Sequence, residues 1–409
     1  MESDRKRLEQ FFEKRLEGYL TELRRMVAVN SFTRNAAGVN LLGEQTTELF
    51  SRLGFAAERI PSANLAFGDH FLLSRPGSSA IQIGLVSHLD TVFPPEEEFA
   101  NNFCWREDSE RIYGPGTVDI KGGTLLIYMM LEALQNFFPN AFERVNWLIL
   151  LDASEETLSD DFGELCRERL KGAKACLVFE AGHFQDGMFR LVTSRKGMAK
   201  YRLTAEGKGA HAGTSHPDGA NAIVQLAQAV DEIHRFTDYD RDLTFNIGYF
   251  NGGTVANRVP HFAEAYGEMR SYSKSIFDEG VARLLSLDNL STIGNGDGYR
   301  CLVRVMIFNT TRPWPKNEAT ENLFQLWADL GRELGWRLEP EARGGLSDGN
   351  HTWEDIPTLD GLGAGGGNAH CSEHLPSVGK EQEYLSLPSL IPKSILNTLA
   401  VVRLIDQAG

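Results

Sequence analysis

Hydrophobic positions in the first part of the chain follow two different patterns. A helical period covers 4–29, 40–53 and 120–134. Mostly apolar runs lie at 81–86, 145–151 and 175–179. A period of three to four residues is typical of an amphipathic helix, whereas a short apolar run is typical of a strand buried on both faces. Two further strands are predicted at 56–61 and 64–73, and a long loop rich in Pro, Glu, Asn and Gly is predicted at 91–116. The alternation of strands and helices predicts an α/β fold.

The pattern changes near residue 191. Alternating or apolar segments predict strands at 196–204, 243–250 and 263–270, and helical periods predict helices at 220–236 and 275–285. We interpret this region as an inserted α+β domain with four antiparallel strands and two helices. The predicted domains are a discontinuous catalytic domain, 1–191 and 311–409, and an insert, 192–310.

The composition of the chain excludes some classes of partner and indicates a cellular compartment. The 409 residues are 42% hydrophobic and 24% charged, with a net charge of -15. This is typical of a globular enzyme and argues against nucleic acid or an anionic membrane as the main partner. Five scattered cysteines form no Cys-x-x-Cys pair, and we find neither a secretory signal nor an apolar stretch of membrane-spanning length. We therefore expect a cytoplasmic protein.

Polar residues with metal-binding chemistry follow the predicted strands, which places them at the carboxyl edge of the sheet. His88 and Asp90 follow the run 81–86 after one intervening serine. Residues two apart on an extended chain point the same way, so Asp90 could orient the ring of a metal-binding His88. The same pair is also typical of a plain polar strand end.

Four more carboxylate residues allow both a structural and a metal-site interpretation. Asp119 precedes a predicted helix and is either its N-cap or a carboxylate that bridges two metal ions. Glu155 and Glu156 either begin a solvated helix or divide two roles, one as metal ligand and one as general base. Glu180 ends the strand 175–179 and is either a strand terminus or a ligand.

A glycine-rich loop, 363–374, carries the last candidates, His370 and His374. Either is a further ligand or a solvated loop histidine. Two imidazoles and three carboxylates without a thiolate suit two divalent ions, with zinc favoured over cobalt or manganese. In such sites a bridging carboxylate and water join ions about 3.5–4 Å apart.

Several motifs together resemble the co-catalytic zinc aminoacylase/carboxypeptidase family, which includes glutamate carboxypeptidase, acetylornithine deacetylase and succinyl-diaminopimelate desuccinylase. They are Ser87-His-Leu-Asp-Thr-Val, Gly114-Pro-Gly-Thr-Val-Asp-Ile-Lys-Gly-Gly, Glu155-Glu156, Glu180-Ala-Gly, Gly207-Lys-Gly-Ala-His-Ala-Gly, Gly252-Gly-Thr-Val-Ala-Asn-Arg-Val-Pro260 and Ala263-Glu-Ala-Tyr-Gly-Glu-Met-Arg270. The last three motifs look most like the glutamate carboxypeptidase branch. The resemblance implies a zinc-exopeptidase-like catalytic domain, with a central mixed sheet flanked by helices, and an inserted lid or dimerisation domain.

The resemblance also implies roles. His88 and Glu180 would hold one metal, Glu156 and His370 the other, and Asp119 would bridge them. Asp90 would orient His88, and Glu155 would be the general base. A cis peptide would follow Asp119. We assign His370 rather than His374 because Gly-Gly-Asn-Ala-His is the closer motif match.

In the insert, the resemblance implies that His211 completes the active site of a partner subunit in a homodimer. Arg270 would bind the substrate's α-carboxylate, with Asn246 assisting, although Arg270 is also typical of a surface strand. The motif Gly345-Leu-Ser-Asp-Gly-Asn350 resembles a substrate-side loop of the family. Two features depart from the family pattern. Thr157–Asp161 replaces the small residues that usually follow the glutamate pair, and Glu383 lies unusually far beyond His370.

The predicted function is hydrolysis of an amide bond to an amino acid with a free α-carboxylate, in an acylated amino acid or short peptide. A hydroxide bridging the metals would attack, and Glu155 would move the proton. Alternatives are a deacylase of N-acetyl or N-succinyl amino acids, a hydrolase of ureido compounds, or a non-catalytic binding relative.

Overall fold

The computed structural model describes residues 2–157 and 159–407. The chain divides into two compact units. Unit 1 comprises Met1–Thr193, Lys316–Ala342 and Ser347–Gly409, and unit 2 comprises Ser194–Pro315 and Arg343–Leu346. The insert predicted at 192–310 lies almost entirely in unit 2, to which a short segment near residue 345 also belongs.

Unit 1 is organised around a six-stranded mixed sheet of order β1-β2-β6-β3-β7-β15. Its strands are β1 (Ala56–Ile60), β2 (His70–Arg75), β3 (Gln82–His88), β6 (Asn146–Asp152), β7 (Ala175–Val178) and β15 (Thr358–Leu359). Strands β6, β3, β7 and β15 run parallel, whereas β2 pairs antiparallel with β6. The carboxyl ends of the parallel strands therefore meet at one edge of the sheet, as predicted.

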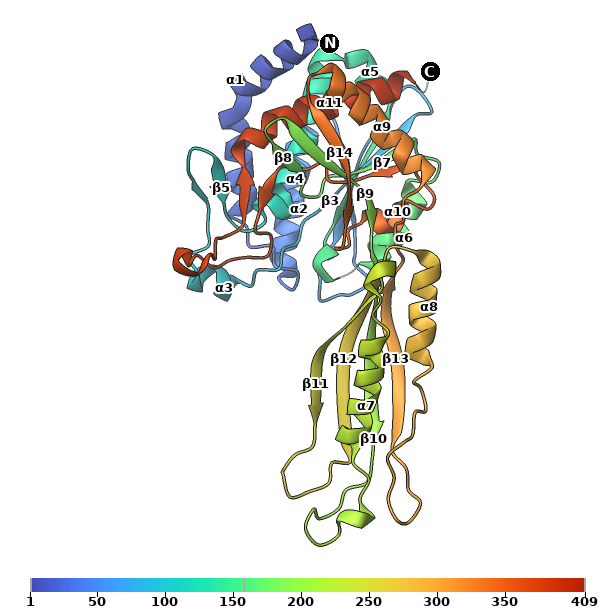
Figure 1. The fold of residues 1–409 in the computed structure, drawn as a ribbon. Helices are drawn as coiled ribbons and strands as arrows, with labels where there is room; N and C mark the ends of the chain where they lie inside the picture. The colour runs from blue at the N-terminus through green and yellow to red at the C-terminus, as the bar shows by residue number, and fades with distance from the viewer. Residues whose placement is uncertain (1, 158, 408–409) are drawn as a thin grey trace. The chain divides into compact units, whose positions relative to one another are not determined.

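The central strands β3, β6 and β7 are largely buried on both faces, which explains their apolar runs. On β3, Ile83 and Leu85 belong to one hydrophobic cluster and Val86 belongs to another. The first cluster packs against α1, α4 and α11, and the second packs against α6 (Figure 1). The helices of unit 1 are α1 (Glu2–Val27), α2 (Ala36–Ser51), α3 (Pro95–Ala100), α4 (Gly122–Phe137), α5 (Pro139–Arg144), α6 (Asp160–Arg169), α9 (Glu318–Glu333), α10 (Gly349–Thr352) and α11 (Leu390–Asp406).

The chain also forms two smaller sheets. One has the order β14-β9-β8, and the other has the order β16-β17-β5-β4. Their strands are β4 (Arg106–Glu107), β5 (Arg111–Tyr113), β8 (His183–Gln185), β9 (Met188–Arg195), β14 (Arg337–Arg343), β16 (Gly366–Gly367) and β17 (Tyr384–Ser386). The second sheet connects the glycine-rich loop to the rest of unit 1.

Unit 2 is a four-stranded antiparallel sheet of order β11-β12-β10-β13 with two helices (Figure 1). Its elements are β10 (Gly197–Glu206), α7 (Ala222–Arg235), β11 (Thr244–Gly252), β12 (Phe262–Ser271), α8 (Lys274–Leu285) and β13 (Leu302–Thr311). On β10, Ala199, Tyr201 and Leu203 are buried in the core that the helices cover. The alternating pattern predicted this sheet with one covered face.

Two predicted elements differ from the structure. The strand expected at 64–73 begins only at His70, because side-chain oxygens of Asn64 and Asp161 accept backbone N–H groups of Ala66 and Ala63 and hold a turn. The region expected as a loop at 91–116 contains the short helix α3 and strands β4 and β5. Within the described residues, no helix is both long and apolar enough to cross a membrane.

Candidate metal centre

His88 ends strand β3 and is almost fully buried. Its Nδ1 lies 3.0 Å from the backbone carbonyl of Asp90 and 3.4 Å from that residue's Oδ1. The opposite ring atom, Nε2, lies 3.0 Å from Oδ1 of Asp119 and 3.7 Å from Oε1 of Glu180. Asp90 therefore orients the ring chiefly through its backbone carbonyl, which leaves Nε2 as the atom that could bind a cation.

The Asp90 carboxylate has a second use that the sequence did not reveal. Its Oδ1 accepts the backbone N–H of Glu155 at 3.1 Å, and its Oδ2 accepts that of Glu156 at 3.3 Å. Oδ2 also accepts the hydroxyl of Thr33 at 2.6 Å. Asp90 thus positions both the His88 ring and the turn that carries the glutamate pair.

Asp119 lies in the turn Thr117–Lys121 before α4, and the predicted cis peptide follows it. Its two carboxylate oxygens face different histidines, with Oδ1 3.0 Å from Nε2 of His88 and Oδ2 3.3 Å from Nε2 of His370. Burial raises the pKa of Asp119, but the hydrogen bonds from His370 and His88 outweigh burial and hold its pKa below the usual value. One ionised carboxylate can therefore serve two adjacent cation sites.

Glu155 and Glu156 form a short 3₁₀ turn, Glu155–Thr157, beyond the end of β6. Oε2 of Glu156 lies 3.2 Å from Nε2 of His370. Burial raises the pKa of Glu155 well above its usual value; His88 opposes this shift, whereas the Glu180 and Glu156 carboxylates add to it. A carboxyl group with a raised pKa is suited to accept and return a proton.

His370, rather than His374, reaches the cluster. Its side chain is 53% exposed, and its backbone has a positive φ of 67°. The preceding glycine-rich strand explains the approach, because a Cβ on Gly366 would lie 2.2 Å from the backbone oxygen of Tyr384. Hydrogen bonds with Asp119 and Glu156 raise the pKa of His370 to about 10.

The five predicted ligands form two groups that share Asp119. One is His88, Asp119 and Glu180, the other is Asp119, Glu156 and His370, and within each group the ligand atoms lie within 4.8 Å of one another. Imidazole nitrogens and carboxylate oxygens are ligands for zinc and similar divalent ions. Cations would also offset the repulsion among these buried carboxylates. The residues therefore fit a two-metal site.

Glu383 supports this site and was recognised in the sequence only as a displaced motif residue. Its Oε1 accepts the backbone N–H groups of Val118 and Asp119 at 3.0 and 3.2 Å. Its own N–H donates to the carbonyl of Cys371 at 2.7 Å. Burial, with the Asp119 charge nearby, raises the pKa of Glu383 to about 8. Glu383 therefore links the Asp119 turn to the loop after His370.

Asp348 is another buried carboxylate, and it belongs to the predicted substrate-side loop 345–350. Burial raises its pKa well above the usual value, and the charge of Asp152 adds to the effect. The motif marked the loop, but its sequence did not indicate that this aspartate is buried.

The remaining predicted residues belong to unit 2. Nδ1 of His211 accepts the backbone N–H groups of Gly213 and Thr214, both at 3.1 Å, so the proton of a neutral ring lies on Nε2. Arg270 on β12 makes a two-point ion pair with Glu268, at 2.7 and 3.2 Å, and donates to the carbonyl of Gly344 at 2.9 Å. Asn246 is exposed on the edge strand β11.

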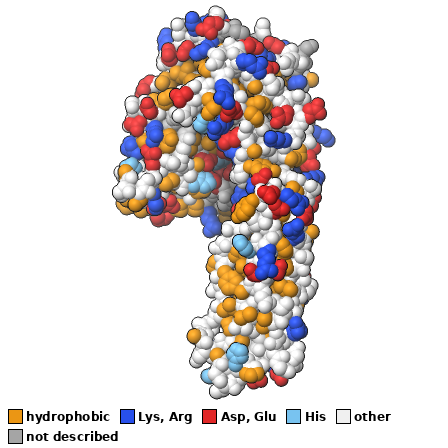
Figure 2. Space-filling model, viewed as in Figure 1, with side chains coloured by type: hydrophobic (Ala, Val, Ile, Leu, Met, Phe, Trp, Pro, Cys, Tyr) orange, Lys and Arg blue, Asp and Glu red, His pale blue; other side chains and the backbone are white. Residues whose placement is uncertain are grey.

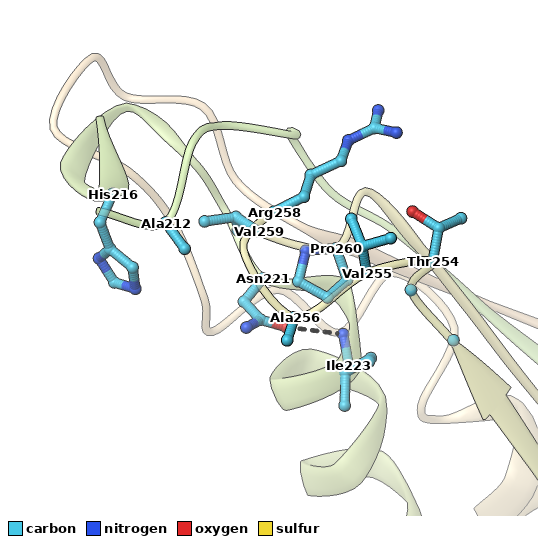
Figure 3. Close-up of a pocket in the computed structure, with 12 residues that line it drawn as sticks. Ala212, His216, Asn221, Ile223, Thr254, Val255, Ala256, Arg258, Val259 and Pro260 are labelled. Atoms are coloured by element: carbon cyan, nitrogen blue, oxygen red, sulfur yellow. Dashed lines mark hydrogen bonds between the residues drawn. The ribbon is translucent and has the colours of Figure 1, made fainter. Parts of the chain in front are cut away.

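A hollow of about 540 Å³ lies near the N-terminus of α7 in unit 2 (Figure 3). Asn221 caps α7 by accepting the N–H of Ile223, and the guanidinium of Arg258 points away from it. The twelve residues that line this hollow include one histidine, His216, and no carboxylate. Its lining therefore does not provide a metal site like that of unit 1.

Comparisons with known proteins agree with this geometry. Residues 193–287 match the peptidase dimerisation domain. The chain is 26% identical over 350 residues to carboxypeptidase G2 of Pseudomonas sp. strain RS-16, covering 85% of this chain and 82% of that protein. It is 24% identical over 272 residues to acetylornithine deacetylase of Edwardsiella ictaluri, covering 62% and 68%. An M20 family metallo-carboxypeptidase from Sulfolobus solfataricus has a similar fold, with a TM-score of 0.68, 15% identity, and coverage of 95% and 99%.

Proposed function

Because the chain belongs to the M20 peptidase family, we propose that it is a metal-dependent hydrolase that releases an amino acid with a free α-carboxylate from an amide. The observation that carries this proposal is the sharing of Asp119 between two groups of ligands. His88 and His370 face different oxygens of this carboxylate. Such an arrangement suits a pair of cations rather than one.

We propose zinc as the native metal, with cobalt or manganese as substitutes. His88, Glu180, Glu156 and His370 would hold the two ions, and Asp119 would bridge them. Bound ions of this kind polarise a carbonyl and lower the pKa of water towards about 7. The donor set supports zinc because it combines imidazole nitrogens with carboxylate oxygens.

The chain's own residues supply proton transfer and orientation. Glu155 would take a proton from the attacking water and return it to the leaving amine. Its position is supported by the hydrogen bond from its backbone to Asp90, which also orients His88 through its carbonyl. A base held by the same residue as a ligand keeps a constant geometry relative to that ligand.

A free α-carboxylate on the substrate should be required for turnover. We expect N-acyl-glutamates and related acyl amino acids to be hydrolysed, and the same compounds with the α-carboxylate converted to an amide to be poor substrates. Measuring the released amino acid for each matched pair tests this. Equal rates for free and blocked compounds would contradict the proposed substrate class. The similarity to carboxypeptidase G2 supports acyl-glutamates as the first panel.

The alternative substrates separate on the same panel. Turnover of N-acetyl or N-succinyl amino acids in preference to acyl-glutamates would indicate a deacylase, towards which the similarity to acetylornithine deacetylase points. Turnover of carbamoyl amino acids alone would indicate a ureido hydrolase. Binding without turnover would indicate the non-catalytic alternative.

We expect Arg270→Ala to raise KM by roughly tenfold to a hundredfold, because a charged hydrogen bond to a carboxylate contributes about 1.5–3 kcal/mol. In the structure Glu268 occupies one edge of this guanidinium, so a substrate carboxylate would compete with it. Glu268→Gln is the matched variant and should not raise KM. Steady-state kinetics on one acyl amino acid measures both. An unchanged KM in Arg270→Ala would remove this role, and any assistance from Asn246 would need separate support.

We further propose that the protein is a homodimer in which His211 acts on the partner subunit's site. Large apolar side chains are exposed on unit 2, among them Met306 and Phe308 on the edge strand β13, and Figure 2 shows such side chains over its surface. Exposed apolar edge strands favour pairing with another chain. The match to a dimerisation domain supports the same assembly.

Co-expression of two inactive variants tests this role. His211→Ala should lower kcat by roughly a hundredfold to a thousandfold if its Nε2–H stabilises the oxyanion. A mixed dimer of His211→Ala with Glu155→Gln, purified with two different tags, should regain activity, because one of its sites receives both residues. A mixed dimer that stays inactive would show that His211 does not act across subunits.

We place the protein in the cytoplasm. All five cysteines are free thiols, as suits a reducing compartment.

A further inference from the structure

His70 is a buried histidine that none of the roles above uses. It is the first residue of β2 and is 1% exposed. Strand β2 pairs antiparallel with β6, and the pair Phe71–Leu151 lies next to His70 in this register. His70 is therefore placed beside Asp152, the last residue of β6 before the turn that carries Glu155 and Glu156.

The two ring nitrogens of His70 contact opposite ends of one segment. Nδ1 lies 3.2 Å from Oδ1 of Asp152, and Nε2 lies 3.2 Å from Oδ2 of Asp161. Asp161 is in the first turn of α6, immediately beyond the glutamate turn. The ring also packs 5.2 Å from the ring of Phe162. A single imidazole thus spans the entry to this turn and the exit from it.

The two aspartates that His70 contacts are also hydrogen-bonded to the serines on either side of the glutamate pair. Oδ1 of Asp152 accepts the backbone N–H of Ser154 at 2.9 Å, and the hydroxyl of Ser159 donates to Asp161 at 3.2 Å. The hydroxyls of Ser154 and Ser159 lie 2.9 Å apart. These bonds form a closed path from His70 through Asp152, Ser154, Ser159 and Asp161 and back, and the contact between the two serines brackets Glu155 and Glu156 in the sequence.

The restraint holds in either protonation state of the ring. The backbone nitrogen of Ala153 lies 3.2 Å from Nδ1, the same distance as Oδ1 of Asp152. A protonated Nδ1 donates to Asp152, whereas an unprotonated Nδ1 accepts the N–H of Ala153. Burial lowers the pKa of His70, but hydrogen bonds to Asp152 and Asp161 raise it overall to about 9, which favours the first arrangement at neutral pH.

We propose that His70 is a positioning residue that fixes the Glu155–Glu156 turn by bridging Asp152 and Asp161. This inference rests on the proposed function for the roles of the two glutamates. It also accounts for a departure of this sequence from its family, since Asp161 lies in the stretch that replaces the usual small residues. The Asp90 carboxylate accepts the backbone N–H groups of Glu155 and Glu156. His70 instead contacts the two ends of the segment that carries this turn, Asp152 and Asp161.

The test compares His70→Ala with a control on the same strand. Leu73→Ala is suitable because Leu73 is fully buried and belongs to the hydrophobic cluster on the opposite face of the sheet. Both variants should lose thermal stability. His70→Ala should also lower kcat, and weaken the binding of one of two zinc ions, by about tenfold to a hundredfold, with KM within about twofold. Leu73→Ala should change neither.

Two further measurements keep the test independent of folding and of the reaction. Asp161→Asn, which alters a partly exposed side chain, should fold and should reproduce part of the zinc-affinity loss. Hydrogen exchange of the amides from Ala153 to Thr157 should be faster in His70→Ala than in Leu73→Ala. If the wild-type protein hydrolyses no acyl amino acid, the proposed function fails, but zinc affinity and exchange still test His70. A His70→Ala protein that matches Leu73→Ala in zinc affinity and exchange overturns the inference.

Discussion

Replacing Glu155 by glutamine should lower kcat by about a hundredfold to ten-thousandfold, the usual contribution of a general acid–base residue. Glutamine has nearly the same size and cannot take up a proton at this position. The backbone N–H of residue 155 still reaches Asp90, so the turn should keep its shape. We therefore expect the metal content to stay that of the wild type.

Single-turnover kinetics together with metal analysis measures this effect. Glu164→Gln provides the control, because this exposed residue lies on α6, shortly after the same turn. It should leave kcat unchanged. Turnover within a few-fold of the wild type in Glu155→Gln would remove Glu155 as the base and require another proton acceptor in the site.

Replacing the metal ligands one at a time should change the number of bound ions in a pattern that only a shared, bridging ligand predicts. Asp119→Ala should weaken both metal sites, because Asp119 belongs to both groups of ligands. Glu156→Ala should lose the ion held with His370 and retain the one held with His88 and Glu180. Glu180→Ala should show the reverse. Each lost ligand should reduce the affinity for its metal ion by at least about a hundredfold, which is more than the loss of a residue that only orients a ligand.

Elemental analysis after equilibrium dialysis against buffered zinc measures these occupancies. Asp108→Ala, an exposed aspartate outside both groups, is the control and should bind metal as the wild type does. Equal occupancies in the Asp119 and Glu156 variants would contradict the bridging role of Asp119. Loss of both ions from the Glu180 variant would show that the two sites are not separable in this way.

Much of the site could be predicted from the sequence because the carboxyl ends of neighbouring parallel strands meet at one edge of a sheet. His88 ends one parallel strand, and Glu180 and Glu156 follow two others, so their side chains meet at one edge of the sheet. Apolar runs marked these strands because both faces are buried. The choice of His370 over His374 rested on motif resemblance, and the structure brings His370 to Asp119 and Glu156.

Contacts between distant segments explain what the sequence did not reveal. The Asp90 carboxylate holds the glutamate turn because two parallel strands end side by side, which no local pattern indicates. His70 reaches Asp152 through an antiparallel register that depends on where β2 begins, and the predicted strand began six residues too early. Glu383 reaches Asp119 across a loop whose length departs from the family pattern. Local periodicity cannot specify such pairings.

Metal content measured together with reversible activity tests the central claim most directly. The purified protein would be analysed for metals and assayed on an N-acyl-glutamate before chelation, after chelation, and after zinc is returned. We predict about two zinc ions per chain, loss of hydrolysis on chelation, and recovery on adding zinc. A protein that binds no metal at the His88–Asp119–Glu180 and Asp119–Glu156–His370 groups, or that hydrolyses the amide equally well without metal, would contradict the account.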